Sequence, residues 1–533
     1  MKRFLIANST LLLISALGFW TIETDSFFVL RVASSIAILV STFILPGVYG
    51  TLILERLRKK RFSFFEYATV SILLSLCLPP LLLSIEYRLF GSVFPTLPLI
   101  NSFLLFGGAA LLLFFGEKQL PPLPDRTPIF PNEKRSVIEL VLSFLFFVGI
   151  ALLFTTAYFP LPDLDPYYWL MKFEKLFVNG ALLPLSYRPL FSSLVYIFTV
   201  GAHIDFYSFF KYLLPSFFLL LLAPTFLIAQ TFRRLDERAV LILSPFSSGI
   251  SIIFLMLPIP QALASLFLFS SSALLFHSLR SKDPFFFFAG GLLLFFGSFY
   301  HESLALPFTL WGFFTALSFR KELLLLSERI LSSFLLLLLL APRVLSPLSF
   351  LVERLGAFLP AFLHFHPNFQ FPLSYVNVDG AQMGWGTWTE MLLYYAFYVG
   401  PVLSLLLGLI TVSLFRKRQT RHTLWAALPK ETLVVGSIFL AFFSIAEILP
   451  RIVGIAYLPD RAWVFCALLS PFFLAIFLHS FRRISKILTS LFLVGLLINL
   501  GAAIFINEKK QYVITEAELR SAEWIRKIFP KIV

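Results

Sequence analysis

The stretch IELVLSFLFFVGIALLF, residues 138–154, decides the class of this protein. It carries one carboxylate and one hydroxyl, and the run of residues 217–228 is similarly apolar. Hydrophobic residues make up 58% of the 533-residue chain, and phenylalanine supplies 67 residues. A soluble domain of this length needs far more polar surface, whereas in lipid apolar side chains need no burial against each other. The sequence therefore predicts an integral membrane protein.

The apolar runs are long enough to be membrane-spanning helices, each of which needs about 20 residues to cross the hydrocarbon core. The predicted fold class is an all-α polytopic membrane protein with about fifteen transmembrane helices. The spans are predicted at residues 4–20, 27–54, 64–86, 92–116, 136–156, 207–231, 239–256, 259–278, 284–299, 302–319, 323–342, 391–415, 433–449, 461–480 and 486–506.

The formal net charge of +14 comes from short basic clusters between apolar runs, such as residues 55–61 and 416–418. Positive residues concentrate on the cytoplasmic side of membrane proteins. With the N-terminus in the cytoplasm, all of these clusters fall on the inner side of the predicted spans. We therefore expect the lipid bilayer, and not nucleic acid, as the partner of this charge, with a prokaryotic plasma membrane as the location.

Residues 190–200 test this topology, because they are apolar enough to form a short span. Counting them as a crossing would place several basic clusters outside, so we expect a helix lying along the outer interface. Proline and charge mark residues 117–135 as a cytoplasmic connection. The predicted parts are four leading helices in 1–135, a membrane core in 136–342 with an outer loop at 157–206, an outer loop at 343–390, C-terminal helices in 391–506 and an outer tail at 507–533.

The first candidate site is LPDLDPYYW, residues 161–169, just after the fifth predicted span. Two close carboxylates such as Asp163 and Asp165 can share a divalent cation or supply a general base. Asp165 followed by Pro166 is also typical of a helix cap with proline at the first helical position, which predicts an interfacial helix over residues 167–178. The alternative is a capped helix anchored in the membrane by its aromatic residues, without chemistry.

The second candidate is the pair His301 and Glu302, in the predicted outer turn between the ninth and tenth spans. Ionisable residues at the ends of apolar helices are candidates for function, because the bilayer core excludes charge. The topology places Glu302 on the same side as Asp165. A polar hinge between two spans is the alternative.

The third candidate is Asp460 with Arg461, at the outer start of the fourteenth predicted span. A guanidinium at the membrane edge suits a lipid phosphate, which it can bind with two parallel hydrogen bonds. The alternative is a local ion pair or a simple headgroup contact. Arg188 and Lys172 are further candidates for binding an anion.

These motifs, in this order, resemble those of the GT-C membrane glycosyltransferases. The run from Asp165 to Tyr168 resembles the Asp-Pro-Tyr run of oligosaccharyltransferases, and residues 187–213 are similar to a helix and span of protein mannosyltransferases. His301-Glu302 resembles a motif of lipid-linked-oligosaccharide glucosyltransferases, and residues 459–463 resemble a late Asp-Arg motif. The resemblance covers residues 136–506. The Trp-Trp-Asp acceptor motif of oligosaccharyltransferases is absent, which argues against transfer onto protein asparagine.

The resemblance implies an inverting enzyme that moves a sugar from a polyprenyl-phosphate donor to a glycan, lipid or protein acceptor on the outer face. It allows a divalent cation, Mg²⁺ or Mn²⁺, at Asp163 and Asp165. The resemblance implies that Asp165 is the general base or a carboxylate that organises the metal. Glu302 with His301 would complete the acidic site or hold the donor sugar, and Arg461 would neutralise the leaving phosphate. The further implied substrate-binding residues are Asp460, Arg188, Tyr167, Tyr168 and Lys172. The alternatives are a transporter or flippase of lipid-linked sugars, and a polysaccharide polymerase or ligase.

Overall fold

The computed structural model shows a chain that is helical over most of the residues it describes. The described residues are 2–22, 28–58, 60–117, 133–156, 164–184, 187–230, 235–246, 248–281, 283–318, 374–376, 382–384, 387–406, 430–453, 459–480 and 485–508. Asp163, the predicted span 323–342, most of the outer loop 343–390 and most of the tail from residue 507 lie outside them.

Five of the described helices are long and apolar enough to cross a membrane. They are Val32–Arg58, Phe64–Phe90, Phe206–Ala229, Pro260–Ser278 and Lys486–Ile504. Each of them overlaps a span predicted from the sequence. Shorter apolar helices overlap several other predicted spans, among them Ser9–Phe19 and Pro284–Ser298. The membrane class is therefore supported, whereas the count of about fifteen spans stays a prediction.

The chain divides into two compact units, which are described separately here. Unit 1 contains the described residues of Met1–Ala223 together with Pro258–Pro260. Unit 2 contains Pro224–Leu257 and the described residues from Gln261 onward. The predicted boundary at residues 117–135 therefore does not coincide with the division between the units.

Unit 1 carries the first eleven α-helices, the last of which continues into unit 2, together with short π- and 3₁₀-helical segments labelled η. They are α1 (Lys2–Ile22), α2 (Phe28–Leu39), η1 (Val40–Ile44), α3 (Leu45–Arg58), α4 (Phe64–Phe90), α5 (Leu97–Glu117), α6 (Glu133–Thr156), α7 (Leu164–Val178), α8 (Pro189–Tyr196), η2 (Ile197–Gly201), α9 (Phe206–Ser208), η3 (Phe209–Leu213), α10 (Leu214–Ser216), η4 (Phe217–Leu221) and α11 (Leu222–Ala229).

Small residues hold the long helices of unit 1 together. A Cβ atom added to Gly47 of α3 would lie 2.1 Å from the backbone oxygen of Ser71 in α4, so only glycine allows this approach. Beside it the Ser71 hydroxyl donates to Thr51 Oγ1 over 2.9 Å. Close backbone approach with hydroxyl hydrogen bonds is typical of helix packing in lipid, where hydrophobicity does not drive helices together.

The segment predicted to lie along the outer interface is buried within unit 1. All residues of α8 are buried, and Ser193 of α8 shares a 2.7 Å hydrogen bond with Ser84 of α4. Tyr196, one of the residues expected to give this segment a polar side, is only 1% exposed. The location of residues 190–200 along the outer interface stays a prediction. Helix α8 packs against other helices of unit 1, among them α4 and α7.

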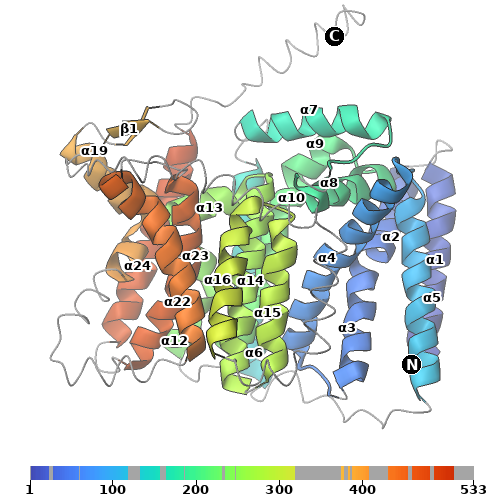
Figure 1. The fold of residues 1–533 in the computed structure, drawn as a ribbon, viewed down its shortest axis with the longest axis horizontal. Coiled ribbons are helices and arrows are strands. Elements are labelled where there is room, and N and C mark those ends of the chain that lie inside the picture. Colours follow the sequence, from blue (N-terminus) through green and yellow to red (C-terminus); the bar gives the residue numbers. More distant parts are fainter. Residues whose placement is uncertain are drawn as a thin grey trace, which may run out of the picture. The chain divides into compact units, whose positions relative to one another are not determined.

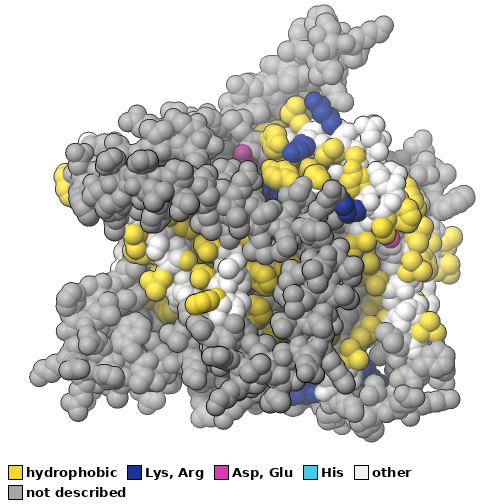
Figure 2. All heavy atoms as spheres, viewed as in Figure 1, with side chains coloured by type: hydrophobic (Ala, Val, Ile, Leu, Met, Phe, Trp, Pro, Cys, Tyr) yellow, Lys and Arg dark blue, Asp and Glu magenta, His cyan; other side chains and the backbone are white. Residues whose placement is uncertain are grey.

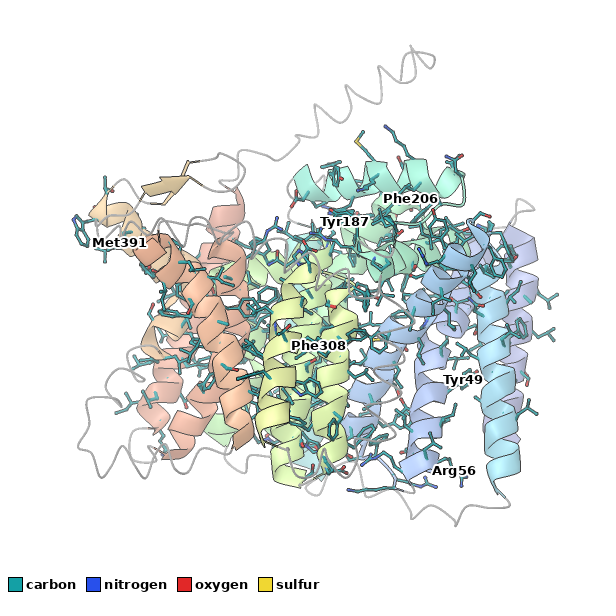
Figure 3. All side chains as sticks on the ribbon, viewed as in Figure 1. Tyr49, Arg56, Tyr187, Phe206, Phe308 and Met391 are labelled. Atoms are coloured by element: carbon teal, nitrogen blue, oxygen red, sulfur yellow. The ribbon has the colours of Figure 1, made fainter. Side chains whose placement is uncertain are left out.

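The two ends of unit 1 differ in character. Arg56 lies in the last turn of α3, within the basic cluster of residues 55–61. It is at the opposite end of unit 1 from Tyr187, which precedes α8, and from Phe206, which begins α9 (Figure 3). Helix α7 lies crosswise at the end that carries Tyr187 and Phe206 (Figure 1). The basic cluster and α7 therefore lie at opposite ends of unit 1, and the assignment of these ends to the inner and outer sides stays a prediction.

Unit 2 carries the remaining helices and a short antiparallel hairpin, the one strand pairing among the described residues. Its elements are α12 (Leu235–Ile242), η5 (Ser244–Phe246), α13 (Gly249–Met256), α14 (Pro260–Ser281), α15 (Pro284–Ser298), η6 (Glu302–Leu304), α16 (Ala305–Ser318), β1 (Ser374–Val376), β2 (Gln382–Gly384), α19 (Trp388–Leu393), η7 (Tyr394–Val399), α22 (Lys430–Phe443), η8 (Ser444–Val453), α23 (Pro459–Ser480) and α24 (Ser485–Glu508).

Within unit 2, α23 is the central helix among those described. It packs against α12, α13, α22 and α24. Its residues from Ala462 to Ser470 are all buried, including Trp463, whose side chain is 1% exposed. Helix α23 is thus buried over this stretch by other helices of unit 2.

Candidate functional site

Helix α7 carries the first predicted motif. It begins at Leu164 and ends at Val178, so its end agrees with the prediction and its start is slightly earlier. Asp165 is therefore a residue of the first turn and not the cap. A carboxylate in the first turn is favoured by the positive end of the helix dipole. Its side chain is exposed, which leaves it accessible to a substrate.

One face of α7 anchors it to unit 1. Trp169, Phe173 and Phe177 are buried, and the Trp169 and Phe173 rings both lie 5.5 Å from the ring of Phe191 in α8. Phe177 contacts Tyr196 edge-on at 5.0 Å. Burial raises the pKa of Tyr196 to about 12, so its hydroxyl stays protonated at neutral pH. Aromatic packing of this kind fixes the orientation of α7.

A turn after α7 makes a second attachment. Gly180 has φ +61°, and its carbonyl accepts a 2.8 Å hydrogen bond from the backbone N–H of Val93. A Cβ atom on Gly180 would lie 2.5 Å from the Val93 oxygen. Only glycine satisfies both the positive φ and the close approach.

Lys172 lies among three aromatic rings at the edge of this buried face. Its Nζ is 5.1 Å from the ring centre of Tyr168, 5.3 Å from that of Trp169 and 4.9 Å from that of Tyr187. It also donates a 3.0 Å hydrogen bond to the Tyr168 hydroxyl. Ring faces attract cations. Within the part of the chain that the structure describes, Lys172 forms no ion pair with a carboxylate.

Arg188 adds a second cation to the same rings. Its Cζ lies 5.3 Å from the ring centre of Trp169 and 5.1 Å from that of Tyr187. Its backbone is left-handed, with φ 48° and ψ 48°. Pro189 follows it and disfavours the right-handed helical region at the preceding residue. Such a conformation costs about 1 kcal/mol for a non-glycine residue and is found most often where function requires it.

We call Tyr168, Trp169, Lys172, Tyr187 and Arg188 the cation–aromatic cluster. Helical spacing places Asp165, Tyr168 and Lys172 on one side of α7, so the carboxylate follows the same side as the cluster. Figure 2 shows lysine and arginine side chains among hydrophobic ones over α7. The predicted residue Tyr167, half-buried, lies next to them in the sequence. The arrangement can bind an anion through the cations and present a carboxylate nearby.

The predicted divalent cation is not tested by the described residues. They contain no group of three or more His, Cys, Asp or Glu side chains that could hold a metal ion. Asp165 is described, but its predicted partner Asp163 is not. One exposed carboxylate is too small a donor set for a dedicated cation site, so no chemical step below is assigned to a metal.

His301 and Glu302 lie in the short turn between α15 and α16, as predicted. His301 is buried, and its Nδ1 accepts from the Ser303 backbone N–H at 3.3 Å and shares a 2.9 Å hydrogen bond with the Ser303 hydroxyl. These contacts give His301 a role in shaping the turn, which is the polar-hinge alternative. Glu302 is half-buried at the start of η6.

Arg461 and Asp460 lie in the first turn of α23, which begins at Pro459. The predicted helix start is therefore confirmed, with proline at a position where its missing N–H costs nothing. The Arg461 side chain is half-buried. Arg461 and Glu302 belong to unit 2 and Asp165 to unit 1, so a site that joins all three stays a prediction.

Two buried ionisable residues were not identified as candidates from the sequence. Lys211, in η3, is 3% exposed, and Glu447, in η8, is 8% exposed and accepts a short hydrogen bond from the Tyr395 hydroxyl. Each is a charged residue inside an otherwise apolar run. Such residues mark function in membrane proteins, and the predicted spans 207–231 and 433–449 already contained this signal.

The chain was compared with protein-family models, curated proteins and solved structures. None of them matches it.

Proposed function

We propose that this protein is a membrane glycosyltransferase that moves a sugar from a polyprenyl-phosphate donor to an acceptor on the outer face of the membrane. The observation that carries the proposal is the cation–aromatic cluster beside Asp165 on α7. A lipid phosphate needs cations at membrane depth, a sugar ring packs well against aromatic faces, and transfer needs a base.

The position of α7 supports the same function. This helix lies at the end of unit 1 opposite the basic cluster after α3 (Figure 3). Since basic clusters favour the cytoplasmic side, α7 belongs at the outer interface. There Lys172 and Arg188 meet the phosphate of a lipid whose chain remains in the bilayer.

In the proposed reaction Asp165 accepts the proton of an acceptor hydroxyl. The resulting oxygen attacks the anomeric carbon of the donor sugar, and the bond from that carbon to the phosphate oxygen breaks. The electron pair of the broken bond leaves with the polyprenyl phosphate, and the anomeric centre inverts. Lys172 and Arg188 stabilise the charge that builds on the phosphate. Arg461, Glu302 and His301 remain the sequence-based candidates for further contacts.

The test measures the free polyprenyl phosphate that any such transfer must release. Protein in liposomes receives farnesyl phosphate esterified with radiolabelled glucose, galactose, mannose or N-acetylglucosamine, with a membrane extract of the source cells as acceptor. We expect release from at least one donor, and Asp165→Asn should slow it by about 100-fold or more because general-base catalysis contributes that much. Glu174→Gln, an exposed change on the same helix, is the matched control.

The outcomes separate the alternatives. Full activity of a folded Asp165→Asn variant would remove Asp165 as the base. Movement of labelled lipid across the liposome membrane, without release of farnesyl phosphate from any donor, would replace the proposal with a flippase. Products that carry many added sugars would indicate a polymerase.

A further inference from the structure

Three residues of unit 2 form a cluster that the proposed reaction does not use. Tyr395 lies in η7, Glu447 in η8 and Trp463 in α23. The Tyr395 hydroxyl donates to Glu447 Oε1, and the Tyr395 and Trp463 rings meet edge-on with centres 6.3 Å apart. We call these residues the carboxylate–aromatic cluster.

Contacts along α23 place the carboxylate beside the tryptophan. Trp463 and Cys466 are three residues apart and therefore share a face of the helix. Tyr395 contacts both of the other members of the cluster, since its hydroxyl donates to Glu447 and its ring meets that of Trp463. The ring of Phe443, one turn before Glu447, packs edge-on against Trp463 at 5.8 Å.

Trp463 has an unused hydrogen-bond donor. Its side chain is 1% exposed, and its indole N–H has no acceptor among the described residues. Buried indole N–H groups usually have a partner, because an unpaired buried donor costs about 1–3 kcal/mol. A purely structural pairing of Tyr395 with Glu447 leaves this donor unexplained.

The backbone gives an independent indication. Both Tyr395 and Glu447 lie in π-helical segments, Tyr394–Val399 and Ser444–Val453. Such segments are rare and occur often at functional sites. An acidic residue in an apolar helix is in addition costly to keep there without a role.

We propose that the carboxylate–aromatic cluster recognises the hydroxyl groups of a sugar ring. The carboxylate accepts hydrogen bonds from sugar hydroxyls, the Trp463 N–H donates to a sugar oxygen, and the half-buried Tyr395 ring offers apolar surface to the C–H face. A carboxylate has about four acceptor positions, of which the bond from Tyr395 takes one. This inference rests on the proposed function, in that the ligand carries a sugar.

The test follows Trp463 by ¹⁹F NMR of the full chain labelled with 5-fluorotryptophan, in a detergent without sugar. The Trp463→Phe variant assigns its resonance among the 8 tryptophans. Farnesyl phosphate and its glucose, galactose, mannose and N-acetylglucosamine esters are titrated separately. We expect at least one ester to move the Trp463 resonance, whereas farnesyl phosphate alone does not.

Conservative variants then test the polar contacts. Glu447→Gln and Tyr395→Phe should weaken binding of that ester by about 10-fold, the value of one hydrogen bond to a charged group, relative to farnesyl phosphate. Ser437→Ala is the matched control, because its hydroxyl bonds only to the backbone of its own helix, α22, about three turns away.

The results distinguish this inference from the proposed function. Esters that bind without moving Trp463, or that bind Glu447→Gln undiminished, would overturn the inference and leave the transferase standing. Failure of farnesyl phosphate and of every ester to bind would overturn both.

Discussion

The cation–aromatic cluster of unit 1 and the carboxylate–aromatic cluster of unit 2 surround charges of opposite sign with the same kinds of rings. Lys172 and Arg188 lie over ring faces at a partly exposed edge. Glu447 is buried and takes a hydrogen bond from a tyrosine hydroxyl. Ring faces attract cations and repel anions. The carboxylate is therefore stabilised by a hydrogen bond from a tyrosine hydroxyl, whereas the cations are stabilised by cation–π contacts with the ring faces.

This difference has a consequence for ligand chemistry. Cations over ring faces stay charged beside a partly exposed surface, which suits the binding of an anion. A buried carboxylate already bound to a hydroxyl is suited to other neutral hydroxyl groups. The cation–aromatic cluster thus fits a phosphate group, and the carboxylate–aromatic cluster fits the hydroxyl groups of a sugar.

The largest expected effect concerns phosphate binding by the cation–aromatic cluster. The double variant Lys172→Ala, Arg188→Ala should bind farnesyl phosphate about 100-fold more weakly, because hydrogen bonds from charged groups contribute about 1.5–3 kcal/mol each. Calorimetric titration in a detergent without sugar measures this. The affinity of the unchanged protein should also fall as salt increases, while that of the variant changes little. Equal affinity of the two proteins would exclude the cation–aromatic cluster as the phosphate site.

A smaller effect concerns the free energy of unfolding, which should depend more on the buried carboxylate–aromatic cluster than on the partly exposed cation–aromatic cluster. Tyr395→Phe removes the hydroxyl that donates to Glu447 and should lower the free energy of unfolding by about 2 kcal/mol, the contribution of a buried hydrogen bond to a carboxylate. Lys172→Met should cost less than about 1 kcal/mol, since cation–π contacts at exposed sites contribute little. Denaturation in mixed micelles measures both. A greater loss in Lys172→Met would reverse the proposed distinction.

The smallest effect tests the attachment of α7. Gly91 and Gly180 both have positive φ, but a Cβ atom meets nothing within 4 Å at Gly91 and lies 2.5 Å from Val93 O at Gly180. Gly180→Ala should therefore destabilise the protein by at least about 1 kcal/mol more than Gly91→Ala, because overpacking adds to the backbone strain. The same unfolding measurement compares them. Equal losses would mean that the Val93 contact does not constrain the turn.

Local sequence patterns predicted where helices begin and end, but they did not predict the contacts between helices. The end of α7 at Val178 and the start of α23 near Arg461 follow from proline, caps and apolar periodicity, which act within a few residues. The burial of α8 depends on α4, and the Tyr395–Glu447 bond joins residues 52 apart. No local pattern contains such partners.

The candidate site was predicted where charge lies outside apolar runs and missed where it lies inside them. Asp165, Lys172 and Arg188 were recognised because they interrupt the chain between spans. Glu447 and Lys211 lie within apolar runs, so the sequence analysis counted them as parts of predicted spans. Left-handed Arg188 could not be foreseen either, since Pro189 restricts its backbone without selecting that conformation.

The hydrogen bond between Ser84 and Ser193 has a consequence for biosynthesis. These residues are 109 positions apart, so α4 leaves the ribosome long before the helix that covers it. At about 5–20 residues per second the delay is roughly 5–20 s. During that interval the inner surface of α4, with its serine hydroxyl, stays uncovered by α8. The nascent protein therefore needs lipid, the insertion machinery or a chaperone beside α4 until α8 is made.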